Sequence, residues 1–195
     1  DVRAPVEFAK GTLPSAVNLP FINDEERHLI GICYKEKGQQ AAIDLGHQLV
    51  NGDHKKVRVR AWQHFIQQHP NAVLYCARGG LRSLLSQQWL AQSGIDCPRI
   101  EGGYKSLRTF LLNYLVESCR TETFTLLSGM TGTGKTDIIK TLHTSIDLEG
   151  HANHKGSSFG RSLTEQPTQS DFENNLALAL LDMREKHPRQ RIILE

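Results

Sequence analysis

Long hydrophobic runs and paired cysteines are both missing from this sequence of 195 residues. No apolar run approaches the roughly 18 residues of a membrane-spanning helix, so no membrane partner is expected. The four cysteines, Cys33, Cys76, Cys97 and Cys119, are scattered and form no C-x-x-C pair, which argues against a zinc site and a disulfide framework. Reduced thiols in a cytoplasmic protein are the simplest interpretation.

An initiator Met and a secretory leader are also missing, because the sequence opens directly on Asp1-Val2-Arg3. It closes on the apolar run 192–194 followed by Glu195, which is typical of a buried parallel strand. We therefore expect a fragment of a longer protein. The net charge of +2 neither indicates nor excludes a local basic patch for nucleic acid.

Strand-like apolar runs alternate with helical patterns, without an internal repeat or a low-complexity tract. Short strands are predicted at 73–75, 99–100, 124–127, 145–148 and 191–194. Helices are predicted at 81–91, 107–116, from about 135, and at 172–183. This alternation predicts an α/β fold with a mainly parallel sheet. The polar stretch 117–122 marks a boundary, which gives predicted domains at 1–118 and 119–195, the second one incomplete.

The segment 75–83, YCARGGLRS, places a cysteine between a predicted strand and a predicted helix. Backbone N–H groups of such a loop form a nest for an anion, and the helix N-terminus adds positive potential. Both effects lower the pKa of the Cys76 thiol and favour the nucleophilic thiolate, which could carry a persulfide or perselenide. A lone buried structural cysteine is the plainer alternative, but the strand–loop–helix context favours a nucleophile. The oxyanion contacts are assigned to Arg78, Gly79, Gly80 and Arg82.

This hypothesis requires the Cys76 thiol to face solvent, since a thiol turned into the interior could not meet a donor. The other three cysteines are interpreted as structural. The basic run 54–60 is interpreted as a solvated helix face that could contact an RNA backbone.

A second motif, GMTGTGKT at 129–136, matches the phosphate-binding pattern G-x-x-x-x-G-K-T. The predicted strand before it and the helix after it are the context that the pattern needs. Lys135 would contact a terminal phosphate and the Thr136 hydroxyl could hold Mg²⁺, whereas no other metal site and no tightly bound cofactor are predicted. Phosphate binding is assigned to Gly129, Thr131, Gly132, Gly134, Lys135 and Thr136. The strand that ends at Glu195 resembles a Walker-B strand with Glu in place of the usual Asp.

The segment 147–161, DLEGHANHKGSSFGR, follows a predicted strand end, where α/β sheets place ligands. His151 and His154 lack an evident third ligand, which argues against a metal site. Contacts to RNA or to a diphosphate are assigned to His154, Lys155, Ser157, Ser158 and Arg161. A merely solvated loop is an equal alternative.

Several motifs in the first half of the sequence resemble the rhodanese superfamily. The opening D-V-R at 1–3 looks like the family's D-x-R, the segment 7–20 looks like its E-[FY]…N-[IL]-P stretch, and E-G-G-Y at 101–104 looks like its closing turn. Common sulfurtransferases carry Arg five positions after Cys, whereas Arg82 stands six positions after Cys76, as in dual-specificity phosphatases. The longer loop implies room for a phosphate-like group such as selenophosphate or thiophosphate.

Both motifs together, with the D-L-E-G…G-S-S-F-G block, resemble the bacterial tRNA 2-selenouridine synthase family. The resemblance implies a transferase that first S-geranylates wobble 2-thiouridine of a tRNA with geranyl diphosphate. Selenium derived from selenophosphate then displaces the geranylthio group. It also implies selenophosphate synthetase as a partner, cytoplasmic localisation and a monomer. Our assignment of geranyl diphosphate to the motif at 129–136 is a hypothesis.

Two alternatives share parts of this pattern. A rhodanese-type sulfurtransferase fused to a P-loop NTPase or kinase would carry both motifs and would hydrolyse ATP. A dual-specificity phosphatase would share the C-x5-R spacing, but it usually has an acidic or polar loop, unlike the uncharged Gly79-Gly80.

Overall fold

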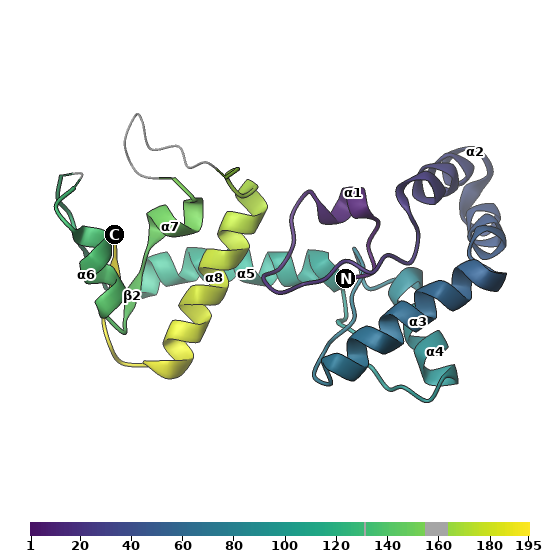
Figure 1. The fold of residues 1–195 in the computed structure, drawn as a ribbon. Coiled ribbons are helices and arrows are strands. Elements are labelled where there is room, and N and C mark those ends of the chain that lie inside the picture. The colour runs from purple at the N-terminus through teal and green to yellow at the C-terminus, as the bar shows by residue number, and fades with distance from the viewer. Residues whose placement is uncertain (131, 155–163) are drawn as a thin grey trace. The chain divides into compact units, whose positions relative to one another are not determined.

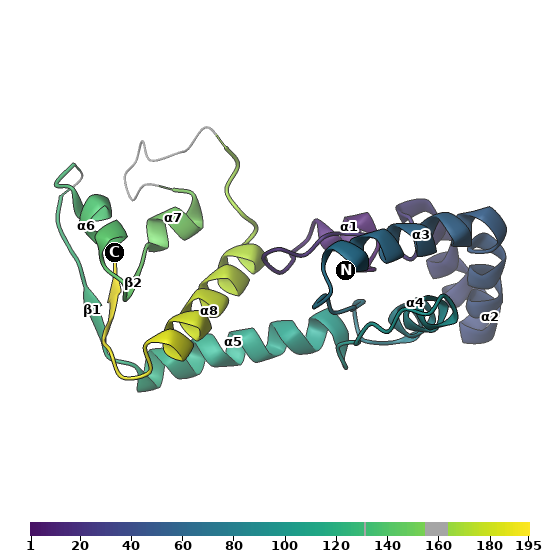
Figure 2. The ribbon, with the colours of Figure 1, turned by 60° about the horizontal axis from the view of Figure 1, so that its bottom comes forward.

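The chain divides into two units, seen in Figures 1 and 2, in a computed structural model that describes residues 1–130, 132–154 and 164–195. Unit 1 comprises residues 1–10 and 15–107, and unit 2 comprises residues 11–14 and 108–195. No helix among the described residues is long and apolar enough to cross a membrane. The domain limits at 1–118 and 119–195 stay a prediction of the sequence.

Unit 1 is mainly helical. Its elements are α1 (Pro5–Phe8), α2 (Asp24–Leu49), α3 (Gly52–Gln68), α4 (Leu81–Gln92) and the first residues of α5 (Gly103–Thr121). An aromatic group lies in its core, where the Phe21 ring is 6.3 Å from that of Trp62 and 5.1 Å from that of Trp89. The predicted helix at 81–91 is confirmed as α4, and the predicted helix at 107–116 extends in both directions as α5.

The strands predicted at 73–75 and 99–100 shrink to an isolated parallel bridge between Leu74 and Arg99. Extended segments nevertheless lie side by side here. The Leu74 N–H donates to Pro98 O at 2.8 Å, and the Val2 N–H donates to Tyr75 O at 2.9 Å. The sequence prediction of full strands was wrong because the Cys76 loop begins directly after these few paired residues. This arrangement delivers Cys76 to the end of an extended segment.

Helix α2 was not predicted, although the sequence carries its start signal. Asn23 and Glu26 form a capping box, in which each side chain accepts a hydrogen bond of 2.8 Å from the other residue's backbone N–H. A kink at Gly38, with φ of 83°, divides α2 into a first arm (24–37) and a second arm (39–49). Glycine suits this position because other residues rarely adopt a positive φ.

The basic run 54–60 lies in α3, as expected for a helix, but it is not wholly solvated. Arg58 donates to both carboxylate oxygens of Glu26 on α2, at 2.8 and 2.7 Å, and Val59 is buried. Lys56 does lie on the surface, where it pairs with Asp53. The interpretation as a solvated face is therefore wrong for Arg58 and Val59.

Unit 2 contains a three-stranded parallel sheet in the order β1-β3-β2. Its elements after α5 are β1 (Phe124–Leu126), α6 (Lys135–Thr141), β2 (Ser145–Ile146), α7 (Leu148–Ala152), α8 (Gln169–Lys186) and β3 (Ile192–Leu194). Ile146, Leu180 and Ile192 form the centre of the core, against which Tyr114 and Leu115 of α5 pack. The predicted strands at 124–127 and 191–194 and the predicted helix at 172–183 are confirmed within a few residues.

Strand β2 ends two residues earlier than predicted because Asp147 begins a helix instead. The Asp147 carboxylate accepts a 2.7 Å hydrogen bond from Gly150 N and so caps α7. A Cβ at Gly150 would lie 2.5 Å from Asp147 Oδ2, so a larger residue there would displace the capping side chain. Helix α7 ends at Ala152, and the following residue, Asn153, donates from its side-chain amide to Thr164 Oγ1 at 2.7 Å.

Candidate active site

Cys76 lies at the start of the loop that leads into α4, and its thiol makes a short hydrogen-bonded chain. Its Sγ donates to the Ser83 hydroxyl at 3.2 Å, and that hydroxyl donates to Gly80 O at 3.1 Å. When the thiol ionises, the Ser83 hydroxyl can turn and donate to the thiolate instead. Ser83 is fully buried, so this donor is held beside the sulfur.

The environment of Cys76 favours its anionic form. Burial alone would raise the pKa of the Cys76 thiol, but the hydrogen bonds of the Ser83 side chain and the backbone N–H groups of Ser83 and Arg78 outweigh it. With the positive charge of Arg82, they hold the pKa below its ordinary value. The sequence prediction of a thiol acidified by a backbone nest therefore has a physical basis here, with Ser83 as the additional donor that was not assigned.

The position of the thiol differs from expectation, because Cys76 is only 2% exposed. The sequence hypothesis required a thiol facing solvent, and in the described conformation this requirement is not met. The reason is that Sγ makes its hydrogen bonds to the Ser83 hydroxyl and to Gly80 O instead of to solvent. Transfer to or from Cys76 therefore requires the loop at Gly79 and Gly80 to move.

Arg82, assigned to an oxyanion, is bound to Glu7 in this structure. The guanidinium contacts the two carboxylate oxygens at 2.5 and 3.1 Å, and Arg27 approaches the same carboxylate at 3.5 Å. Burial would raise the pKa of Glu7, but the hydrogen bond and charge of Arg82, with help from Ala4 N–H and Arg27, lower it. An anionic ligand would therefore compete with Glu7 for these arginines.

The D-x-R motif at residues 1–3 holds Glu7 in place for its ion pair with Arg82. Arg3 donates to Asp1 Oδ2 through Nε at 2.9 Å and through Nη2 at 2.7 Å, and both side chains are nearly inaccessible. Arg3 also donates to the carbonyl oxygen of Glu7 at 3.2 Å. The motif thus positions Glu7, a residue that the sequence analysis quoted in a motif but did not assign to the site.

Glycines allow the Cys76 loop to lie directly on the turn at 102–103. Gly79 and Gly103 have φ values of 65° and 59°. The Tyr104 N–H donates to Cys76 O at 2.8 Å, and Arg99 donates to Gly79 O. A Cβ at Gly103 would press on the Cys76 carbonyl oxygen and lie 2.5 Å from Gly79 N. The closing turn therefore holds the backbone of the reactive loop in the described conformation.

We expect Gly103→Ala to lower the free energy of unfolding of unit 1 by about 2 kcal/mol or more, because backbone atoms must shift in addition to the positive-φ strain. Gly94→Ala is the matched control, since Gly94 also has a positive φ of 77° but a Cβ there meets nothing within 4 Å. It should lose only about 1 kcal/mol. Denaturant titration measures both variants, and equal losses would contradict the close packing of the loop on the turn.

The reactivity of the thiols offers a second test inside the same chain. Cys76 and Cys97 are both 2% exposed, but burial and the charge of Asp96 raise the pKa of the Cys97 thiol. Because a lower pKa supplies thiolate at lower pH, alkylation of Cys76 by iodoacetamide should reach its half-maximal rate at a lower pH than alkylation of Cys97. Peptide mass spectrometry follows each site, and similar pH profiles would contradict an acidified thiol.

Ser83→Ala should slow the alkylation of Cys76 near neutral pH by about tenfold, the effect of losing a hydrogen bond to a charged group worth about 1.5 kcal/mol. Ser86→Ala is the control, because Ser86 is equally buried on α4 but donates to Arg82 O. An unchanged rate in Ser83→Ala would exclude Ser83 as the donor to the thiolate.

The phosphate-binding motif lies between β1 and α6, as predicted. Gly132 and Gly134 have φ values of 85° and 81°, and Gly134 immediately precedes α6. Lys135 Nζ donates to Met130 O at 3.4 Å, across the loop. A Cβ at Gly129 would lie 3.1 Å from Thr133 Oγ1, so the loop closes tightly on its own first residue.

Glu195, after β3, completes this site. Its carboxylate accepts a 3.2 Å hydrogen bond from Thr136 Oγ1 and lies 3.6 Å from Lys135 Nζ. Its side chain is 2% exposed, and among the described residues its Oε2 has no hydrogen-bond partner. An unpartnered buried carboxylate oxygen beside a threonine hydroxyl fits a hard cation such as Mg²⁺. No group of three or more His, Cys, Asp or Glu that could hold a metal occurs in the described part of the chain.

Part of the predicted site falls outside the described residues. These positions are Thr131, Lys155, Ser157, Ser158 and Arg161. His154 is described, and its N–H donates to Glu149 O just after α7. The cysteine loop belongs to unit 1 and the phosphate loop to unit 2.

Known proteins match the chain along most of its length. A family model for the rhodanese-like domain matches residues 1–109, and a model for the tRNA 2-selenouridine synthase AAA domain matches residues 122–195. A curated protein named tRNA 2-selenouridine synthase, from Marinobacter nauticus, is 60% identical over 184 residues, which cover 94% of this chain and 50% of that protein. One of the same name from Pseudomonas putida (strain W619) is 56% identical over 194 residues, covering 99% and 53%.

The chain therefore spans about half the length of the curated relatives it matches. Among solved structures, an N-terminal domain from Clostridium difficile 630 is 31% identical, with a TM-score of 0.49, and the match covers 57% of this chain and 86% of that one.

Proposed function

Because the chain belongs to the rhodanese-like family through residues 1–109, we propose that it is part of a tRNA 2-selenouridine synthase, a transferase that replaces sulfur by selenium in tRNA. The relatives of that name, at 52–60% identity, support the proposal. The observation that carries it is the position of Cys76, directly before the loop that leads into α4, where its Sγ lies 3.2 Å from the Ser83 hydroxyl and these contacts, with nearby backbone N–H groups and Arg82, lower the pKa of the thiol. Cys97, which the sequence analysis interprets as structural, has a raised pKa instead.

The family resemblance implies two stages, which we assign to the two sites. The phosphate loop at 129–136 holds the diphosphate of geranyl diphosphate while the sulfur of wobble 2-thiouridine takes the geranyl group and diphosphate leaves. The selenium of selenophosphate, bound beside Cys76, then attacks C2 of the geranylated base. Geranylthiolate leaves, and water cleaves the Se–P bond to give 2-selenouridine and phosphate. The donor comes from selenophosphate synthetase, and the enzyme acts as a cytoplasmic monomer.

Different residues of the phosphate loop make different contacts to a bound diphosphate. Backbone N–H groups around Gly132 and Gly134 approach the phosphate oxygens, and Lys135 supplies a positive charge. Thr136 and Glu195 would hold a Mg²⁺ ion, which would supply positive charge next to the leaving diphosphate. Since Lys135 pairs with Glu195 at 3.6 Å in this structure, ligand binding exchanges that partner for phosphate.

Incubation of the full-length protein with thiolated tRNA, geranyl diphosphate and selenophosphate, followed by nucleoside mass spectrometry, tests the proposal. We expect S-geranylated 2-thiouridine first and 2-selenouridine later. Rapid ATP hydrolysis together with sulfur transfer from thiosulfate, and no selenium in the tRNA, would favour the sulfurtransferase–NTPase alternative and reject the synthase.

A further inference from the structure

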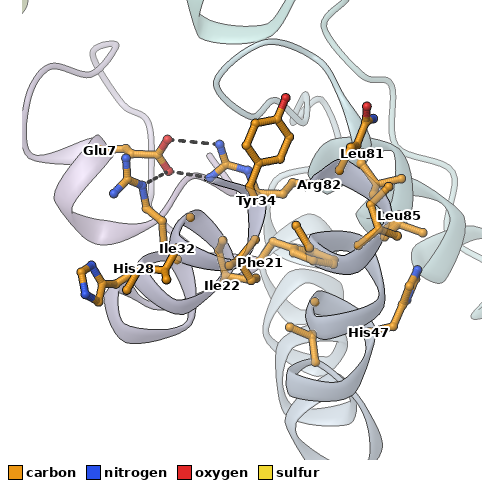
Figure 3. Close-up of a pocket in the computed structure, with 18 of the residues that line it drawn as sticks. Glu7, Phe21, Ile22, His28, Ile32, Tyr34, His47, Leu81, Arg82 and Leu85 are labelled. Carbon is orange, nitrogen blue, oxygen red and sulfur yellow. Dashed lines mark hydrogen bonds and ion pairs between the residues drawn. The ribbon is translucent and has the colours of Figure 1, made fainter. Parts of the chain in front are cut away.

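A cavity of about 900 Å³ lies in unit 1, between the two arms of α2 and the start of α4 (Figure 3). Its walls are mainly apolar and include Ile30, Ile43, Leu81, Leu85 and Trp89. This volume lies within the range of about 300–1,000 Å³ that is usual for small-molecule sites. Neither the sequence motifs nor the proposed chemistry at Cys76 accounts for such a cavity.

The charged residues that line the cavity are almost all cationic. They are Arg27, Lys35, Arg78 and Arg82, against the single carboxylate of Glu7. Glu7 already pairs with Arg82, at 2.5 Å (Figure 3), and with Arg27, at 3.5 Å. Apolar walls with an excess of positive charge suit a ligand that combines a hydrocarbon part with an anionic part.

The cavity is continuous with the reactive loop. Arg78 belongs to the loop that follows Cys76, and Leu81 and Arg82 form the first turn of α4, whose buried Ser83 contacts the sulfur. Cys76 itself does not line the cavity, because its thiol is turned inward. A movement of the loop that exposes the thiol would therefore expose it next to this cavity.

We propose that the cavity binds the hydrocarbon substituent of a phosphate-bearing substrate while the Cys76 loop acts on that substrate. Resting on the proposed function, this substituent is the geranyl chain of the S-geranylated nucleotide, and the arginines meet its phosphates. The physical reason is that selenium transfer needs the geranylated base beside Cys76, where an exposed branched chain would otherwise remain in water.

Gly46, on the second arm of α2, allows the cavity to be filled with little risk to the fold. It lines the cavity, and a Cβ there would lie 3.7 Å from Ile30 Cδ1, an ordinary contact. Leucine is a better helix former than glycine, so Gly46→Leu should keep α2 intact. Gln48→Leu is the matched control, since Gln48 lies on the same arm but is exposed and does not line the cavity.

Calorimetric titration of the full-length protein with S-geranyl-2-thiouridine 5′-monophosphate tests the proposal. The unmodified protein, Gln48→Leu and Cys76→Ser should bind it alike, and Gly46→Leu at least tenfold more weakly. The same nucleotide without the geranyl group should bind weakly to all four proteins, and geraniol more weakly than the geranylated nucleotide. Equal affinity of Gly46→Leu and Gln48→Leu for the geranylated nucleotide would overturn the cavity assignment.

The tRNA assay separates this inference from the proposed function. Gly46→Leu should accumulate geranylated tRNA while Cys76 keeps its alkylation rate. If Gly46→Leu completes both tRNA steps normally, the cavity assignment fails and the proposed function stands. If no tRNA product forms in any protein but Gly46→Leu alone loses nucleotide binding, the proposed function fails and the cavity assignment stands.

Discussion

Cys76→Ser in the full-length protein is expected to stop selenium incorporation, by about three orders of magnitude or more, and to leave S-geranylated tRNA as the product. A serine hydroxyl does not ionise near neutral pH, so the donors that stabilise the thiolate find no anion to stabilise. Serine is close in size to cysteine and can still donate to Ser83, so unit 1 should keep its fold. Nucleoside mass spectrometry of the tRNA measures both products.

Cys97→Ser is the matched control for this variant. Cys97 is as buried as Cys76, with Sγ contacts to the Ala72 and Pro98 carbonyl oxygens at 3.6 and 3.8 Å, but its pKa is raised. Its replacement should leave selenium incorporation unchanged. A Cys76→Ser protein that also fails to geranylate tRNA, while remaining folded, would refute the division of the reaction between the two units.

The sequence predicts the fold class and the family well, because both depend on short local motifs in a fixed order. The rhodanese-like and P-loop-like halves and the family resemblance are confirmed by the matches over residues 1–109 and 122–195 and by relatives at 52–60% identity. A strand, a glycine-containing loop and a helix start follow one another within a few residues, so the loop at 129–136 is readable without tertiary information.

Contacts between distant residues could not be read in this way. Glu7 meets Arg82 across 75 positions and Thr136 meets Glu195 across 59, and no local pattern pairs them. The inward position of the Cys76 thiol depends on Ser83, whose hydroxyl could equally have faced solvent. The signal for Ser83 was its place one turn into the helix after the loop, where a hydroxyl can turn back toward the sulfur.

The α2 cavity escaped prediction for a related reason. The capping box at Asn23 and Glu26 indicates the start of a helix. Gly38 interrupts the apolar periodicity of residues 24–49, so the sequence pattern predicts neither arm as a helix. Only the folding back of the second arm at a positive φ brings Ile30 and Ile43 to one cavity. The cavity forms because the kink at Gly38 turns the two arms of α2 toward each other. The sequence gives the order of the residues along α2 but not the angle between its arms.

Lys135→Ala is expected to reduce S-geranylation of thiolated tRNA by about 10- to 100-fold at limiting geranyl diphosphate, because it removes a charge-assisted contact worth about 1.5–3 kcal/mol. The alkylation rate of Cys76 should stay unchanged, since the thiol belongs to unit 1. Lys140→Ala, an identical change at an exposed position of α6, is the control and should geranylate normally. The mutation also removes the positively charged partner of the buried Glu195, so the unfolding midpoint of Lys135→Ala is measured to show that the protein stays folded. If a folded Lys135→Ala protein geranylates tRNA at the full rate, geranyl diphosphate does not bind at this loop, and a nucleotide becomes the better candidate for its ligand.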